Sequence, residues 1–114
     1  MSFHAGMAAE EAVARDYERR GFVIVCNRWR GKAGEIDIVA QDGDGLIFIE
    51  VKQSRNFESA AASLSSRQMG RIYNCANEFL GTQPRGSLTE VRFDVALVNA
   101  HGETQIIENA FGHG

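Results

Sequence analysis

Two short apolar runs near the middle of the chain carry charged side chains that are unfavourable to bury. Asp37 interrupts the run at residues 34–40, and Glu50 and Lys52 lie at the end of the run at residues 47–52. Charges in apolar strands are unstable unless they are paired or bind a metal ion. An aspartate held beside a Glu-x-Lys sequence is the combination that a metal-dependent phosphodiesterase needs.

A turn signal between the two runs predicts a hairpin that brings these charges together. Residues 42–45 read Asp-Gly-Asp-Gly, and a loop of these four residues fixes the strand register. Because side chains alternate between faces with a period of two, the register places Asp37 opposite Glu50. The same count places Glu35 opposite Lys52. Glu35 then either orients the lysine or lies in water at the entrance of the strand.

The two opposed carboxylates predict a cation site. Their Cβ atoms would lie about 5 Å apart, where carboxylates repel each other unless a cation or a proton lies between them. Mg²⁺ binds one or two carboxylates and fills its other positions with water and phosphate oxygens. We therefore expect Asp37 and Glu50 to bind Mg²⁺ or Mn²⁺, with the Val51 carbonyl as a candidate third ligand. Lys52 would act on the attacking water or stabilise charge on the phosphorane.

The alternative for each charge taken singly is an ordinary surface group. A Glu–Lys pair at an exposed strand end contributes only a few tenths of a kcal/mol, so the prediction depends on the combination. Arg92 and Asp94 share one face of a later strand. We expect them to form a structural ion pair beside the site rather than to bind metal.

Basic residues cluster in the segment that precedes the hairpin. The net charge of −3 is not that of a strong nucleic-acid binder. However, six basic residues against two acidic ones lie within residues 15–32. Arg28, Arg30 and Lys32, in a predicted loop, would contact phosphates, or the cluster is simply a solvated helix face and loop. Trp29 between them would either stack on an unpaired base or cap the core.

The bulk composition is that of one soluble globular domain. The chain has 114 residues, of which 44% are hydrophobic and 24% charged, so we expect a single domain over residues 1–114. The sequence shows neither a membrane-spanning stretch nor a signal peptide, which predicts a cytoplasmic protein without a membrane partner. Cys26 and Cys75 lack metal-ligand spacing and are expected to be small buried residues.

The periodicity predicts an α/β domain in the order α-β-β-β-α-β-β, with a mixed central sheet flanked by helices. Glu11 borders the buried stripe of the first helix and can point along the edge of the core. Ser65 and Gln68 form a capping box for the second helix. The predicted helices cover residues 7–20 and 66–80, the strands around the hairpin include residues 22–26, 91–98 and 104–107, and residues 53–63 are ambiguous.

Several motifs occur in one order along nearly the whole chain, from about Gly6 to Phe111. They are Glu11-x-x-Ala14-x-x-Tyr17 with Gly21-Phe22, then Asn27, Gly34-Glu35-Ile36-Asp37, Glu50-Val51-Lys52, Arg92-Phe93-Asp94-Val95 and Asn109-Ala110-Phe111. In this respect the chain resembles the YraN-like family of predicted bacterial endonucleases. That family belongs to the restriction-endonuclease-like PD-(D/E)xK superfamily and is distantly similar to archaeal Holliday junction resolvases.

The resemblance implies a restriction-endonuclease-like core and a role for each matching residue. Asp37 and Glu50 would bind the metal, Lys52 would serve the water, and Glu11 on the first helix would complete the acidic cluster. Arg67 stands where related proteins often begin the second helix with a lysine, and it would contact phosphates.

The sequence therefore predicts an endonuclease that uses Mg²⁺ or Mn²⁺ to cleave phosphodiester bonds in DNA, including branched or otherwise structured DNA. Two other classes stay open because fold and function separate readily. One is a non-catalytic module that binds nucleic acid or protein on the same fold. The other is a homodimeric scaffold.

Overall fold

A computed structural model of the chain describes residues 3–110 and shows a five-stranded sheet with helices on it. The strands lie in the order β1-β2-β3-β4-β5, with β3 and β4 parallel and the other neighbours antiparallel, so the expected mixed α/β sheet is confirmed. Phe111 of the last sequence motif lies outside the described residues. The elements are α1 (Phe3–Arg19), β1 (Val23–Arg30), β2 (Glu35–Asp42), β3 (Gly45–Gln53), α2 (Phe57–Ala62), α3 (Ser66–Leu80), the short 3-10 helix η1 (Gly86–Leu88), β4 (Val91–Val98) and β5 (Thr104–Ile107).

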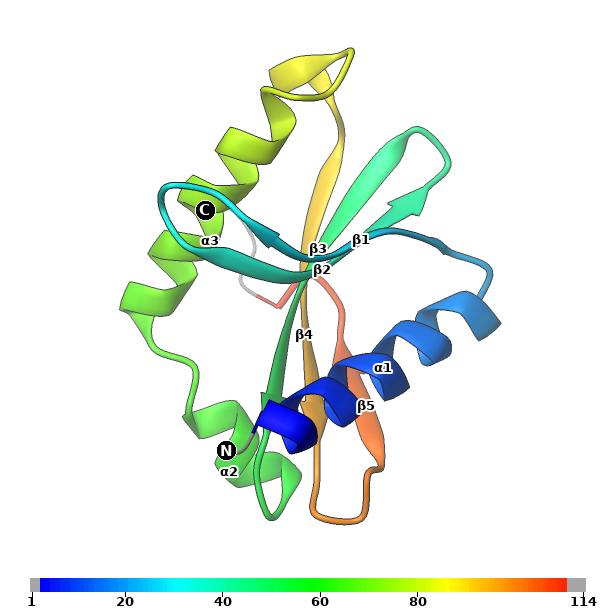
Figure 1. The fold of residues 1–114 in the computed structure, drawn as a ribbon, viewed down its shortest axis with the longest axis vertical. Coiled ribbons are helices and arrows are strands. Elements are labelled where there is room, and N and C mark those ends of the chain that lie inside the picture. The colour runs from blue at the N-terminus through cyan, green and yellow to red at the C-terminus, as the bar shows by residue number, and fades with distance from the viewer. Residues whose placement is uncertain (1–2, 111–114) are drawn as a thin grey trace.

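The helices cover the two faces of the sheet (Figure 1). Val13 and Tyr17 of α1 pack against one face, in a cluster with residues of β2, β3 and β4. On the other face, Phe79 of α3 packs in a second cluster, and Ala60 of α2 packs against β4 in a third. The polar groups of the strands are therefore sorted between an α1 face and an α2/α3 face. Within residues 3–110, no helix is long and apolar enough to cross a membrane.

Local hydrogen bonds explain where the helices after the hairpin begin. The Ser65 hydroxyl accepts the Gln68 amide and the Gln68 side chain accepts the Ser65 amide, both at 3.2 Å, which confirms the predicted capping box. The ambiguous segment before it contains α2, because the Asn56 side chain accepts the Ser59 amide at 2.7 Å. Side-chain caps of this kind satisfy amides that have no partner in the first turn of a helix.

The hairpin keeps the predicted register with a tighter turn. Asp42 pairs with Gly45, so the turn has two residues instead of the expected four. Gly43 in this turn adopts φ 60°, a value that favours glycine. Ile38 pairs with Ile49, as the predicted count requires.

The first strand is longer than expected, which corrects the prediction of a basic loop. β1 continues to Arg30, so Arg28 and Arg30 lie on a strand. Pairing with β2 extends the strand, and Trp29 stabilises it by packing edge-on against Phe79 with ring centroids 5.3 Å apart. Of the two roles considered for Trp29, the structure therefore shows the one that caps the core.

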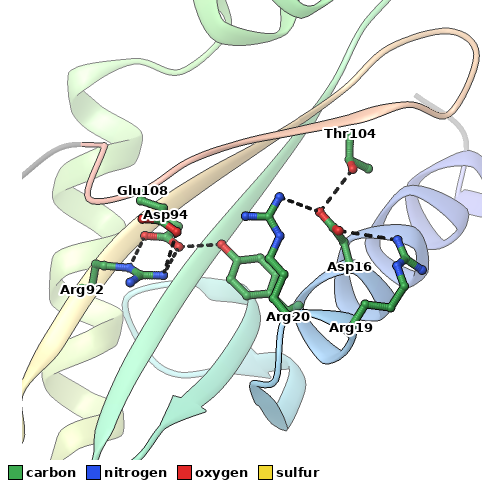
Figure 2. A network of polar contacts seen from close by, with 8 residues as sticks. Asp16, Arg19, Arg20, Arg92, Asp94, Thr104 and Glu108 are labelled. Carbon is green, nitrogen blue, oxygen red and sulfur yellow. Dashed lines mark hydrogen bonds and ion pairs between the residues drawn. The ribbon is translucent and has the colours of Figure 1, made fainter.

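A buried carboxylate on β4 connects α1 to the sheet and to the segment after β5 (Figure 2). Asp94 has 0% exposure and accepts four hydrogen bonds. Arg92 donates two of these bonds, at 2.9 and 3.0 Å, which confirms the expected ion pair. The Tyr17 hydroxyl donates the third at 2.6 Å and the Asn109 amide the fourth at 2.9 Å. Burial and the bond to Asp94 raise the pKa of Tyr17, so the phenol remains a donor.

We expect Tyr17→Phe to lower the free energy of unfolding by about 2 kcal/mol, because a hydrogen bond to a charged group contributes about 1.5–3 kcal/mol. Urea denaturation followed by circular dichroism measures this change. Thr104→Val is the control, since the Thr104 hydroxyl donates to Asp16 at a long 3.4 Å. This change should alter stability by less than about 0.5 kcal/mol. Equal losses in the two variants would contradict the importance of the Asp94 contact.

Candidate active site

The hairpin places Asp37 and Glu50 together on the α2/α3 face, as predicted. The β2–β3 ladder ends with Ile38 opposite Ile49, and the next residues in register are these two. The two side chains line one cavity, and the charge of Glu50 acts on Asp37. Asp37 Oδ2 also accepts a hydrogen bond from the Val51 amide at 2.8 Å. At the end of the ladder, the carboxylate of Asp37 thus serves as the acceptor for a backbone amide of β3.

The environment of Asp37 disfavours its charged form. Burial, followed by the negative charge of Glu50, raises the pKa of Asp37 from its ordinary 3.8 to about 8. The Val51 amide lowers the pKa but does not cancel this rise. Two neighbouring carboxyl groups repel each other unless a proton or a cation offsets their charge, so without a cation Asp37 retains a proton near neutral pH.

Lys52 lies on the same face as the carboxyl pair. Its Nζ lies 3.4 Å from Glu50 Oε2, with 15% and 13% of the two side chains exposed. The expected partner Glu35 instead pairs with Arg30, with Arg30 Nη2 and Glu35 Oε2 3.1 Å apart. The expectation that Glu35 orients Lys52 is therefore wrong. Glu35 pairs with Arg30 because Arg30 lies directly opposite it across β1 and β2.

A cavity of about 230 Å³ opens over the carboxyl pair. Two of its polar residues, Gln68 and Arg71, come from the start of α3 and were not anticipated from the sequence. Their spacing could have indicated them, because Gln68, Arg71 and the buried Ile72 lie at positions i, i+3 and i+4 of one helix face. The cavity is lined by Gly34, Glu35, Asp37, Glu50, Gln68, Arg71 and Ile72.

Another residue missed in the sequence, Glu78, holds the turn between β1 and β2 against α3. Its two carboxylate oxygens accept the amides of Lys32 and Ala33 at 2.9 and 2.8 Å. These bonds lower the pKa of Glu78 and keep it ionised. A side chain at Gly31 would lie 2.8 Å from Trp29 and 2.9 Å from Glu78, so the turn requires glycine there. The turn is therefore a fixed wall beside the cavity.

The acidic residue of α1 that approaches the site is Glu10, which corrects the expectation for Glu11. The Glu11 side chain is 62% exposed and pairs with Arg15 at 3.9 Å. The Glu10 side chain is 16% exposed and accepts a bond from Arg28 Nε at 2.7 Å. Burial raises the pKa of Glu10, and the charge of Asp37 contributes to the rise. One residue turns a helix by about 100°, which separates the inner glutamate from the outer one.

The basic residues expected to contact phosphates are dispersed. Arg28 is held by Glu10 and adopts φ 52°, and it borders a separate cavity of about 550 Å³ between α1 and β1. Arg30 is paired on β1, the Lys32 side chain is exposed in the turn, and Arg67 is exposed at the start of α3. None of these four residues lines the carboxyl cavity. Their contacts with nucleic acid stay predictions.

The Arg92–Asp94 pair does not lie beside the carboxyl site. Asp94 is in register with Ile49, which belongs to the core under α1, and it bonds to Tyr17 on that helix. Glu50 is in register with Val95, which packs under α2 on the opposite face. The expectation that the Arg92–Asp94 pair lies beside the site is therefore wrong. Side chains alternate between the two faces along β4, and the pair lies on the face opposite the site.

The oxygen atoms of the site fit a hard divalent cation. Within residues 3–110, no group of three or more His, Cys, Asp and Glu side chains is arranged to hold a metal ion. A cation bound by Asp37 and Glu50 would thus complete its coordination largely with water, phosphate or backbone oxygens. This is the usual coordination of Mg²⁺ in proteins. The Val51 carbonyl as a ligand stays a prediction.

We expect the metal-free protein to lose stability between about pH 4 and pH 8 through Asp37. The folded state retains a proton that the unfolded chain releases above pH 3.8, until the pH passes the folded pKa of about 8. Asp37→Asn cannot titrate. The difference in unfolding free energy between this variant and the wild type, from urea titrations in EDTA, should change by about 1 kcal/mol or more from pH 5 to pH 8.

The control for this measurement is Asp44→Asn in the exposed turn of the hairpin, which should follow the wild-type pH dependence. If the wild type and Asp37→Asn instead gave parallel curves, Asp37 would not carry the buried proton.

The sequence has close relatives among proteins of unassigned activity. Residues 9–98 match the uncharacterised protein family UPF0102. The chain is 59% identical to a UPF0102 protein of Ruegeria pomeroyi, over 96% of this chain and 89% of the relative. It is 60% identical to one of Cereibacter sphaeroides, over 97% and 95%, and 48% identical to one of Roseobacter denitrificans, over 100% and 88%. The chain therefore belongs to the UPF0102 family, the YraN-like family that its motifs resemble.

Proposed function

We propose that this protein is a metal-dependent endonuclease that hydrolyses phosphodiester bonds in DNA. The observation that carries the proposal is the partly buried Asp37–Glu50 pair, which needs a cation or a proton, with Lys52 on the same face. Strongly perturbed carboxyl groups in a cavity are typical of functional sites. The resemblance to the PD-(D/E)xK superfamily supports the same activity.

Each residue of the site has a distinct task in this proposal. Asp37 and Glu50 hold Mg²⁺ or Mn²⁺. When bound, the cation supplies Lewis-acid chemistry, in which phosphate charge is neutralised and the pKa of a water is lowered. Glu50 holds the Lys52 ammonium over the same face, where it can donate a hydrogen bond to the attacking water or to a phosphate oxygen. Glu10 adds negative charge from the α1 side.

The size of the cavity favours recognition of the phosphate backbone over recognition of bases. Its volume of about 230 Å³ lies below the range of about 300–1,000 Å³ for pockets that enclose whole small ligands. Bases would thus stay outside it. The net charge of −3 also disfavours tight nonspecific binding. We therefore propose that DNA structure, such as a branch or a flap, selects the substrate.

The central test is the activity of Lys52→Ala on single-stranded, duplex, flapped and four-way DNA with Mn²⁺. Loss of a group that acts in the transition state should lower the cleavage rate by about a hundredfold or more, while the variant keeps DNA binding. Calorimetry should show that it also binds Mn²⁺ at least as well as the wild type, whereas Asp37→Asn should not bind Mn²⁺.

An exposed arginine away from the cavity provides the control, since Arg85→Ala also removes one positive charge and should cleave like the wild type. A wild type that cleaves none of these DNAs with any divalent metal, but binds them through Lys52, would instead be a non-catalytic binding module.

A second test compares the neighbouring glutamates of α1. Glu10→Gln should reduce the cleavage rate by about tenfold or more, the scale of losing a group that supports a metal site. Glu11→Gln should change it by less than about twofold, because that side chain faces solvent. Steady-state cleavage of one DNA substrate by both variants measures the difference. The reverse ranking would restore the assignment of Glu11.

A further inference from the structure

One basic side chain faces the carboxyl cavity without an acidic partner. Arg71 lines the cavity together with Asp37 and Glu50. Among the contacts of residues 3–110, it forms neither a hydrogen bond nor an ion pair. By contrast, Lys52 of β3, which lies on the same face of the sheet, is paired with Glu50.

The position of Arg71 is fixed by two rigid elements. It lies on the second turn of α3, whose first turn is closed by the Ser65 capping box. Its side chain passes the turn between β1 and β2, since a Cβ atom built on Gly34 would lie 4.0 Å from Arg71 Cδ. That turn is tied to α3 by the two bonds from Glu78. The backbone that carries Arg71 is therefore held, and its exposed side chain reaches the cavity from the α3 side.

The cavity needs such a group if it is to accept a phosphodiester. Asp37, Glu50 and Glu35 give its lining an excess of negative charge, and a phosphodiester is itself an anion. A divalent cation offsets part of this charge. The remaining phosphate oxygens need donors, and a guanidinium group can bind two of them through parallel N–H bonds. Arg71 is the basic residue in the cavity lining.

We propose that Arg71 binds the phosphodiester in the cavity and positions it over Asp37 and Glu50. This inference rests on the proposed nuclease function and adds a direction of approach. The substrate backbone enters from the α3 side of the sheet, past the turn between β1 and β2. It does not enter from the α1 side, where Arg28 is held by Glu10.

The chain contains a control residue just after the same helix. Arg85 lies between α3 and η1, is exposed like Arg71 and does not line the cavity. Arg71→Ala and Arg85→Ala each remove one exposed arginine, so both variants lose the same charge. They differ in access to the carboxyl pair.

The experiment measures cleavage of the preferred DNA with Mn²⁺ and binding of the same DNA with Ca²⁺ over a salt series. Arg71→Ala should lower kcat/KM by about 10- to 100-fold, the range for a lost hydrogen bond to a charged group. It should also reduce the slope of log binding constant against log salt concentration by about 1, the change expected for one lost phosphate contact. Arg71→Lys should recover only part of kcat/KM, because an ammonium cannot form the bidentate pair.

Arg85→Ala should stay within about twofold of the wild type in kcat/KM. Urea midpoints and Mn²⁺ affinity of all variants should match the wild type, which separates substrate binding from folding and metal binding. Equal kcat/KM and equal salt dependence for Arg71→Ala and the wild type would overturn the inference and leave the proposed nuclease standing.

If the wild type binds DNA but cleaves none of the substrates, the nuclease proposal fails. The binding series then decides the role of Arg71 by itself: a loss specific to Arg71→Ala supports phosphate binding, and an unchanged salt dependence refutes it. A wild type that neither binds nor cleaves DNA would refute both proposals.

Discussion

The buried Asp94 carboxylate is the interaction on which the arrangement of this small fold depends. A charge removed from water is stable only when donors surround it, and here the donors come from Arg92 on β4, Tyr17 on α1 and Asn109 after β5. The contact fixes how α1 lies on the sheet. Glu10 precedes Tyr17 by two helical turns, so a bond on the α1 face determines which carboxylate of the helix approaches the site.

The sheet thus contains a fully buried aspartate, Asp94, and a partly buried one, Asp37, whose charges are compensated to different extents. Asp94 is surrounded by donors and has a structural role. Asp37 has one amide donor, from Val51, and a second carboxyl group against it, so the fold leaves it undercompensated. Natural sequences depart from complete polar satisfaction mainly where function requires it. The contrast between these two aspartates in one sheet makes Asp37 the stronger candidate for chemistry.

The sequence predicted those features that depend on neighbours along the chain or on one hairpin. Alternation and the turn brought Asp37 and Glu50 together, and the capping box marked the start of α3. It failed where position depends on contacts between distant elements. Glu78 and Arg71 join the site only because α3 packs against the turn between β1 and β2. The choice of Glu10 over Glu11 depends on a rotation that the buried stripe of α1 did not define sharply enough from sequence alone.

The bond between Glu78 and the turn also has a consequence for how the site is assembled. The groups around the cavity come from the hairpin, α3 and the turn, and two hydrogen bonds to Glu78 tie the turn to α3. Moving the turn away from α3 requires breaking two hydrogen bonds from backbone amides to an ionised carboxylate. Contacts within the fold itself thus hold this wall of the cavity, which is the condition for a preorganised electrostatic environment.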